Sequence, residues 1–154
     1  MKAAGITREL TVGAEIAGPV RVMTAERIEW YDSAMLSAAK DELAKVGSNI
    51  HTDQAYAASQ GLPGIIGDGM ISTNWISTML VDRFGMDYLE RGELRTKFIR
   101  PVLLGATVSV RGRVTSVERR DDGSLAYALD VWCEDEQGTR LTDGDAKVEV
   151  RLRS

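Results

Sequence analysis

Several residue types are scarce in this sequence, and each shortage excludes a class of protein. The single cysteine, Cys133, cannot form an intramolecular disulfide, which is typical of a reducing compartment. With one histidine and no cluster at ligand spacing, no metal site is expected. No run approaches the roughly 20 apolar residues that cross a bilayer, and residues 1–10 lack the apolar core of a secretion signal. We therefore expect a cytoplasmic protein with no membrane partner.

Basic residues are fewer than acidic ones: the chain has 19 lysines and arginines and 23 aspartates and glutamates, so its formal net charge is −4. An isoelectric point near 5.1 argues against nucleic-acid binding. The length of 154 residues is typical of one domain, over residues 1–154. The charge is uneven, since residues 91–120 carry eight basic side chains against two acidic ones. A solvated sheet face is the ordinary explanation of such a segment, and phosphate binding is the alternative.

The first half of the chain has helical periodicity. Apolar residues recur at helical spacing over residues 25–45. A short helix is expected next, capped by Thr52 or Asp53 and ending near Ala58. The following helix, expected over 69–82, has apolar rows separated by serine, threonine and asparagine. Because small hydroxyls can bond back to the preceding turn, they tolerate burial, so we expect protein on nearly all sides of this helix.

The second half alternates apolar and polar residues with a period of two, which indicates half-buried antiparallel strands. Three such runs begin near Val108, Leu125 and Ala146, with turn residues between them at 121–123 and 136–138. Two short strands are expected earlier, near 8–12 and 20–23. One buried helix and a one-faced antiparallel sheet predict an α+β fold in which the sheet wraps around the helix.

His51, the only histidine, is the first candidate for chemistry. Histidine readily moves protons near neutral pH. Gly69, at the expected start of the buried helix, would present a free backbone N–H with partial positive charge. A proton-transfer group and an oxyanion-stabilising amide are the minimum for chemistry beside a carbonyl. A capping or surface histidine is the alternative, and the residues alone leave both open.

The residues around His51 and Gly69 resemble the signature of the MaoC-like dehydratases and (R)-specific enoyl-CoA hydratases. The matching stretches are Asn49-Ile50-His51-Thr52-Asp53, Ile66-Gly67-Asp68-Gly69-Met70, Lys97-Phe98-Ile99-Arg100-Pro101-Val102 and Gly144-Asp145-Ala146. They occur in the family's order, and the resemblance runs from about Thr11 to Val150. It implies a hotdog fold, in which an antiparallel sheet wraps around a long central helix.

Members of this family mostly add water to, or remove it from, a 2-enoyl or 3-hydroxyacyl thioester. The resemblance implies acid/base chemistry at His51, oxyanion stabilisation by the amide of Gly69, and a place for Asn49 in the same motif. It also implies coenzyme A as a part of the substrate and no further cofactor. Lys97 and Arg100 are the candidates for binding the coenzyme A phosphates.

The sequence departs from the family where a second catalytic group is expected. The family's aspartate lies five positions before the histidine, where this chain has Val46, or Gly47 if one residue is deleted. Neither side chain can accept a proton, and loss of a general acid or base typically costs on the order of 10²–10⁴ in rate. Asp68, at the helix entry, is the first candidate for a substitute, and a helix cap is the competing interpretation. Further candidates on the preceding helix are Tyr31, Asp32 and Asp41.

These observations favour a lyase of the MaoC-like hydratase or dehydratase type, acting on a small-molecule thioester or a related unsaturated carbonyl compound. Two alternatives stay open: a hotdog module that binds a small hydrophobic or acyl ligand without turnover, and a lyase or isomerase repurposed for a substrate not bound to CoA. A thioesterase fits less well, since Gly69 to Val81 contains no carboxylate. The resemblance also implies a homodimer or a dimer of dimers. The three tryptophans, expected in the core or an interface, are Trp30, Trp75 and Trp132.

Overall fold

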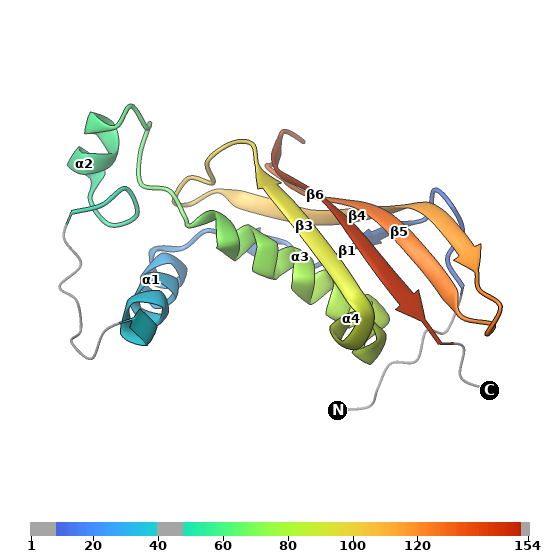
Figure 1. The fold of residues 1–154 in the computed structure, drawn as a ribbon. Coiled ribbons are helices and arrows are strands. Elements are labelled where there is room, and N and C mark those ends of the chain that lie inside the picture. Colours follow the sequence, from blue (N-terminus) through green and yellow to red (C-terminus); the bar gives the residue numbers. More distant parts are fainter. Residues whose placement is uncertain (1–8, 40–47, 152–154) are drawn as a thin grey trace.

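The computed structural model describes residues 9–39 and 48–151, which form an antiparallel sheet around a central helix (Figure 1). The strand order is β1-β4-β5-β6-β3, and β2 also pairs with β4. The long strands are β4 (Thr107–Arg119), β5 (Leu125–Glu134) and β6 (Arg140–Val150). The shorter strands are β1 (Glu15–Ala17), β2 (Arg21–Val22) and β3 (Gly92–Phe98). The expected α+β architecture is confirmed.

The alternation predicted for the three long strands places one face of the sheet in the core. On β4, Val110 and Val114 are buried, whereas Arg111 and Arg113 between and beside them are exposed. The pairing of β4 with β5 sets Val114 opposite Leu129, which is also buried. Because a slip of one residue would turn every apolar side chain outward, this pattern fixes the register of the sheet.

The central helix is α3 (Gly69–Phe84). Its buried side chains are Ile71, Ser72, Trp75, Ile76, Met79, Leu80 and Phe84. Thr78 Oγ1 donates to the carbonyl of Asn74 at 2.9 Å, the back-bond expected of a small hydroxyl. The prediction of protein on nearly all sides is wrong for this chain alone, because Met70, Asn74 and Thr78 form an exposed stripe. The small polar residues lie partly on that stripe, so their presence did not signal burial.

Two helices project beyond one end of the sheet (Figure 1). They are α1 (Ala25–Ala39) and α2 (Gln54–Ser59), and together with residues 48–53 we call them the overhang. Asp53 caps α2 by accepting from the N–H groups of Ala55 and Tyr56, so one of the two predicted caps is confirmed. The predicted continuation of the first helix to about residue 45 lies outside the described residues.

The first strand and one helix differ from the prediction. Strand β1 begins at Glu15, after the segment near 8–12 where a strand was expected. Gly13, with a φ of 87°, forms a turn there and donates from its N–H to the carbonyl of Val114. Pairing with β4, and not local alternation, therefore decides where this strand lies. The short helix α4 (Met86–Arg91) was not predicted. No helix within the described ranges is long and apolar enough to cross a membrane.

Candidate functional site

His51 is held against the segment that leads into α3. Its Nδ1–H donates to the carbonyl of Ile66 at 2.8 Å, and the Ile66 N–H donates back to the carbonyl of Ile50 at 3.2 Å. Because a carbonyl oxygen can only accept, this bond keeps the proton of the neutral imidazole on Nδ1. Nε2 is left as the basic nitrogen, which is the atom that could take a proton from water.

Asn49 and Asp53 shape the loop that carries His51. Asn49 Oδ1 accepts from the N–H of His51 at 2.7 Å and from the hydroxyl of Thr52 at 3.2 Å. Asp53 is engaged with α2, and the pKa of its carboxyl is lowered, chiefly by the N–H that Tyr56 donates to it. The structure thus gives Asn49 the geometry of an Asx turn that positions His51.

Residues 65–69 lie between the His51 loop and the loop that follows β3. The N–H of Gly67 donates to the carbonyl of Val102 at 2.9 Å, and the side chain of Met23 fills the space where a Cβ of Gly67 would lie. A Cβ on Gly69 would lie 2.7 Å from ring atoms of Phe98. Close packing of the chain's own side chains therefore favours glycine at these two positions.

Gly69 and Asp68 form the N-terminus of α3. Asp68 is the N-cap, and its Oδ1 accepts from the N–H of Met70 at 2.8 Å, so the helix-cap interpretation is confirmed. Within the described part of the chain, no hydrogen bond is made by the N–H of Gly69. This amide is free to donate to a ligand, and the helix dipole adds partial positive charge there.

Two side chains of α1 meet this N-terminus. Burial raises the pKa of Asp32, the charge of His51 lowers it, and the charge of Asp68 raises it. Burial likewise raises the pKa of Tyr31, with smaller contributions from Asp68 and Asp32. These electrostatic interactions show that this part of α1 lies near His51 and Asp68. Asp41, Val46 and Gly47 lie outside the described residues.

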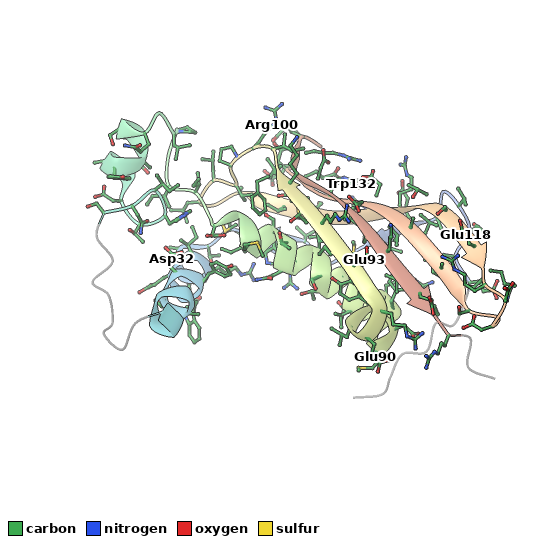
Figure 2. All side chains as sticks on the ribbon, in the orientation of Figure 1. Asp32, Glu90, Glu93, Arg100, Glu118 and Trp132 are labelled. Carbon is green, nitrogen blue, oxygen red and sulfur yellow. The ribbon has the colours of Figure 1, made fainter. Side chains whose placement is uncertain are left out.

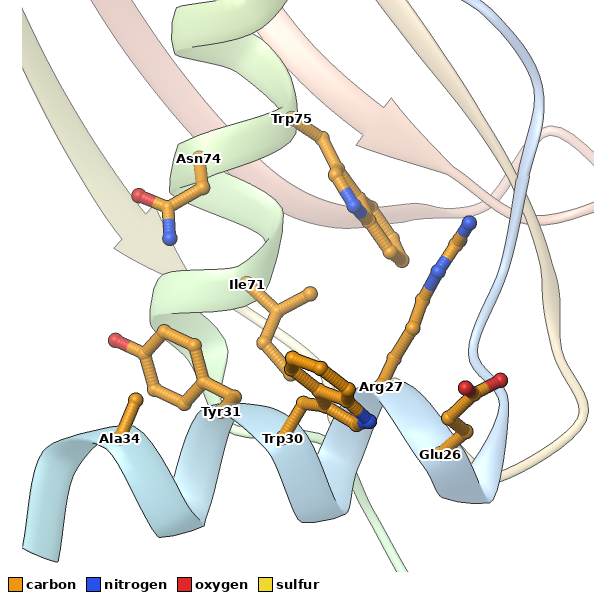
Figure 3. A pocket seen from close by; sticks show the side chains of 8 residues that line it. All are labelled: Glu26, Arg27, Trp30, Tyr31, Ala34, Ile71, Asn74 and Trp75. Carbon is orange, nitrogen blue, oxygen red and sulfur yellow. The ribbon is translucent and has the colours of Figure 1, made fainter. Parts of the chain in front are cut away.

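A groove of about 560 Å³ runs between α1 and α3 (Figure 3). Its lining residues are Glu26, Arg27, Trp30, Tyr31, Ala34, Ile71, Asn74 and Trp75. Trp75 and Trp132 are each 8 % exposed, whereas Trp30 is 73 % exposed. Trp75 belongs to the hydrophobic core, and Trp132 is covered by the guanidinium of Arg140 on the other face of the sheet. Trp30 is therefore not in the core, and a position in an interface stays a prediction. Trp30 and other α1 residues that line the groove recur at helical spacing, and this is the sequence signal that could have indicated a shared face.

Lys97 lies on the opposite face of the sheet from α3. The register pairs Lys97 with Asp143, and Asp143 with Trp132. Paired residues share a face, and Lys97 lines a cavity of about 320 Å³ there with Asp143 and Arg140. Phe98, one residue on, points to the other face and contacts Gly69. The structure thus does not bring Lys97 to His51.

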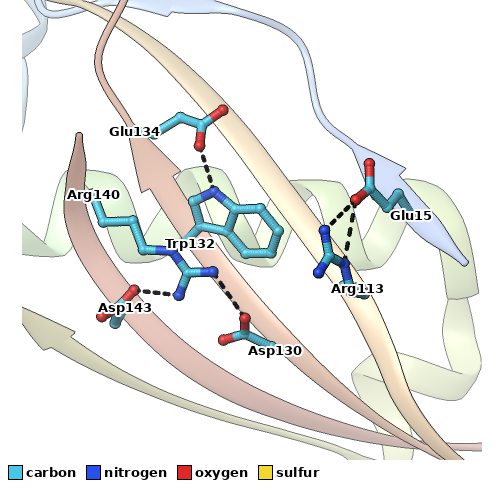
Figure 4. A network of polar contacts seen from close by, with 7 residues as sticks. All are labelled: Glu15, Arg113, Asp130, Trp132, Glu134, Arg140 and Asp143. Atoms are coloured by element: carbon cyan, nitrogen blue, oxygen red, sulfur yellow. Dashed lines mark hydrogen bonds and ion pairs between the residues drawn. The ribbon is translucent and has the colours of Figure 1, made fainter. Parts of the chain in front are cut away.

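A polar network covers that outer face (Figure 4). The guanidinium of Arg140 lies 4.2 Å from the ring centroid of Trp132 and donates to Asp130 and Asp143. On the neighbouring strand β4, Arg113 forms an ion pair with Glu15 of β1. Ion pairs also involve Arg91, Arg111, Arg119 and Arg120 of the basic segment. They favour the ordinary explanation of that segment, a solvated surface. Arg100 is exposed in the loop after β3 (Figure 2), and among the described residues no ion pair involves it.

Comparison with known proteins agrees with this architecture. The family model of the MaoC like domain matches residues 48–133. The (R)-hydratase of A. caviae involved in PHA biosynthesis is 20% identical, with a TM-score of 0.70 over 94% of this chain and 100% of that one. The monoamine oxidase regulatory protein of Archaeoglobus fulgidus is also 20% identical, with a TM-score of 0.70 over 94% and 93% of the two chains.

A third similar structure is the ChsH1-ChsH2 complex of Mycobacterium tuberculosis, which is 17% identical with a TM-score of 0.69 over 93% of this chain and 100% of that one. No curated protein sequence gives a significant match. At such identities the likeness shows the fold, and the expected hotdog fold is confirmed.

Proposed function

Because the chain belongs to the MaoC-like domain family, we propose that it is a lyase that adds water to, or removes it from, an α,β-unsaturated acyl thioester. The observation that carries this proposal is the anchoring of His51 beside the start of α3. The bond from Nδ1–H to Ile66 leaves Nε2 basic. The free amide of Gly69 supplies the oxyanion donor that such chemistry needs.

In the hydration direction, the thioester carbonyl accepts a hydrogen bond from the N–H of Gly69. The helix dipole strengthens this bond as negative charge develops on the carbonyl oxygen. The polarised double bond becomes electrophilic at C3, and Nε2 of His51 takes a proton from the attacking water. Asn49 acts on this step only through the loop, because its side-chain oxygen accepts from the N–H of His51.

The decisive variant is His51→Asn. The amide nitrogen of asparagine can replace Nδ1 as the donor to the carbonyl of Ile66, so the anchor is kept while Nε2 is removed. Turnover of trans-2-butenoyl-CoA, followed by loss of the conjugated enoyl absorbance, should fall by about 10²–10⁴. Gln60→Asn, at the exposed end of α2, is the matched control. Undiminished turnover by His51→Asn would remove this mechanism.

The thioester carrier that we propose is coenzyme A, with Arg100 as a phosphate ligand. The support is positional: Phe98 touches Gly69, so the loop that carries Arg100 begins beside the N-terminus of α3. Arg100→Ala should raise KM for the CoA thioester and leave kcat nearly unchanged. Lys147→Ala, which removes an exposed charge of β6, should change neither. An unchanged KM in Arg100→Ala would exclude this contact.

The groove between α1 and α3 favours a second candidate function, the binding of a small hydrophobic or acyl ligand without turnover. Its volume of about 560 Å³ lies in the range of small-molecule sites, and aromatic rings form much of its wall. Calorimetric binding of octanoyl-CoA or free octanoate, with no product from a panel of enoyl-CoAs, would favour this function. Release of free thiol would instead reveal a thioesterase, and turnover of enoyl compounds without CoA a repurposed lyase.

We also propose that two copies of the chain associate. The exposed stripe of α3 includes Met70, which is 42 % exposed, and strand β3 lies at an edge of the sheet with one side unpaired among the described strands. Light scattering after size exclusion should give twice the mass of 16.8 kDa, or a multiple of it. A strict monomer at micromolar concentration would contradict this.

A further inference from the structure

Asp32 has an unusual environment for a carboxylate. Its Oδ2 is closed off from solvent and has no hydrogen-bond partner among the described residues. A buried carboxylate oxygen without a partner costs free energy, and native proteins keep few such groups. Those that persist are common at functional sites, where an unsatisfied group is available to a substrate. The position of Asp32 therefore requires an explanation that packing does not supply.

The groups that face Asp32 come from three elements. Tyr31 precedes it on α1, Asp68 caps α3, and His51 lies in the segment before α2. Figure 2 shows Asp32 on α1, at the end of the molecule where α3 begins. Asp32 thus lies near His51 and near Asp68, the residue that precedes Gly69 at the start of α3. No other carboxylate in the described residues combines a buried, unpartnered oxygen with this location.

Asp68 is less suited to proton transfer, although it was the first candidate from the sequence. Its Oδ1 already accepts from the N–H of Met70 at 2.8 Å. That bond caps α3 and satisfies one of the free N–H groups of its first turn. A proton on Asp68 would therefore weaken this cap at each turnover, whereas Asp32 Oδ2 has no hydrogen-bond partner among the described residues.

We propose that Asp32 is the second catalytic acid/base of the His51 site, taking the place of the aspartate that the family has five positions before its histidine. This inference rests on the proposed hydration. In that reaction Nε2 of His51 takes one proton from water, and the hydroxyl oxygen forms a bond to C3. The electron pair of the double bond moves onto the thioester to give an enolate.

The enolate then forms a C–H bond at C2 with the proton of the Asp32 carboxyl group. The proton on His51 returns to Asp32, directly or through water, so the enzyme is unchanged and one water has been added. Burial supports this role, because it raises the pKa of Asp32 and so favours the protonated form at higher pH than usual.

The test compares Asp32→Asn with Glu29→Gln, which removes an exposed charge from the same helix. Asp32→Asn should lower kcat for trans-2-butenoyl-CoA by about 10²–10⁴, whereas Glu29→Gln should keep the wild-type rate. Wild-type kcat should decline as pH rises through the raised pKa of Asp32, and Asp32→Asn should lack this decline. Asp32→Glu should recover part of the rate together with the pH dependence.

Two readouts do not depend on turnover. The ring resonances of His51, the only histidine, should shift in Asp32→Asn and not in Glu29→Gln. The Tm of Asp32→Asn at neutral pH should equal or exceed that of the wild type, because a neutral amide is less costly to bury than a carboxylate. This gain should vanish below pH 3.8, the ordinary pKa of aspartate, where the wild-type group is protonated in both folded and unfolded chains.

Each result decides between outcomes. Wild-type kcat in Asp32→Asn overturns the role of Asp32 alone, and so does a marked fall in Tm, which would show a structural carboxylate. Unmoved His51 resonances overturn the proximity of the pair. Wild-type protein without turnover on any enoyl thioester would overturn the proposed function and, with it, the catalytic role of Asp32.

Discussion

The sheet with α3 and the overhang differ in how they use their side chains. In the sheet and α3, apolar residues alternate or repeat regularly toward one shared core. In the overhang, Ile28 and Ala57 are the buried residues among the side chains described there, and Trp30 is 73 % exposed. Yet the overhang carries His51 and Asp32. One region holds most of the buried apolar residues, and the other carries two of the side chains in the proposed site.

The largest change in the free energy of unfolding is expected for a substitution in the core between the sheet and α3. Leu80 is fully buried on α3, so Leu80→Ala should lower the free energy of unfolding by about 2–5 kcal/mol. Leu89, which is 60 % exposed on α4, is a matched control, and Leu89→Ala should change it by no more than about 0.5 kcal/mol. Urea unfolding measures both. Similar losses for the two variants would show that the core is not where the stability resides.

The next largest change in stability is expected at Gly67, where the overhang joins the sheet and α3. A Cβ on Gly67 would collide with the side chain of Met23, which is fully buried. Gly67→Ala should therefore lower the free energy of unfolding by about 1–3 kcal/mol. At Gly64 the nearest atom to an added Cβ is Gln54 Oε1 at 3.5 Å, an ordinary contact. Gly64→Ala should be nearly neutral, and equal losses at the two glycines would contradict the packing argument.

The same division explains what could be predicted from the sequence. A strand such as β5 carries its own pattern, because successive side chains face opposite sides and only one side is buried. Helix α3 is recognisable from its apolar rows, and its start from Asp68 and Gly69. These features are local, so periodicity and capping chemistry are sufficient to identify them.

Only some residues of the candidate site can be identified from the sequence around them. The resemblance to a family predicted His51 and Gly69 in one site, and the bond from His51 to Ile66 holds the His51 loop against the segment that leads to Gly69. Asp32 lies 19 positions before His51, and their meeting depends on how α1 packs beside α3. No spacing rule encodes that approach. As a candidate for the second catalytic group, Asp32 therefore ranked behind Asp68, whose capping role is visible in the sequence.

A smaller effect is expected where α3 begins. Asp68→Ala removes the acceptor of the Met70 N–H and should lower the free energy of unfolding by about 0.5–2 kcal/mol. Asp68→Asn keeps an oxygen that can accept this bond and should lose only a fraction of that amount. Thermal unfolding of the two variants measures the difference. If asparagine were as damaging as alanine, the negative charge itself would matter more than the cap.

The smallest effect on stability is expected at Trp30. Trp30→Phe should change the free energy of unfolding by less than about 0.5 kcal/mol, because its ring is mostly exposed. It should nevertheless remove most of the fluorescence that acrylamide quenches, since Trp75 and Trp132 are each 8 % exposed. Octanoyl-CoA bound in the groove between α1 and α3 should cover Trp30 and protect it from the quencher. Quenching that the ligand leaves unchanged would show that the acyl chain binds elsewhere, and a large loss of stability would show that Trp30 is buried in solution and that the overhang packs as tightly as the core.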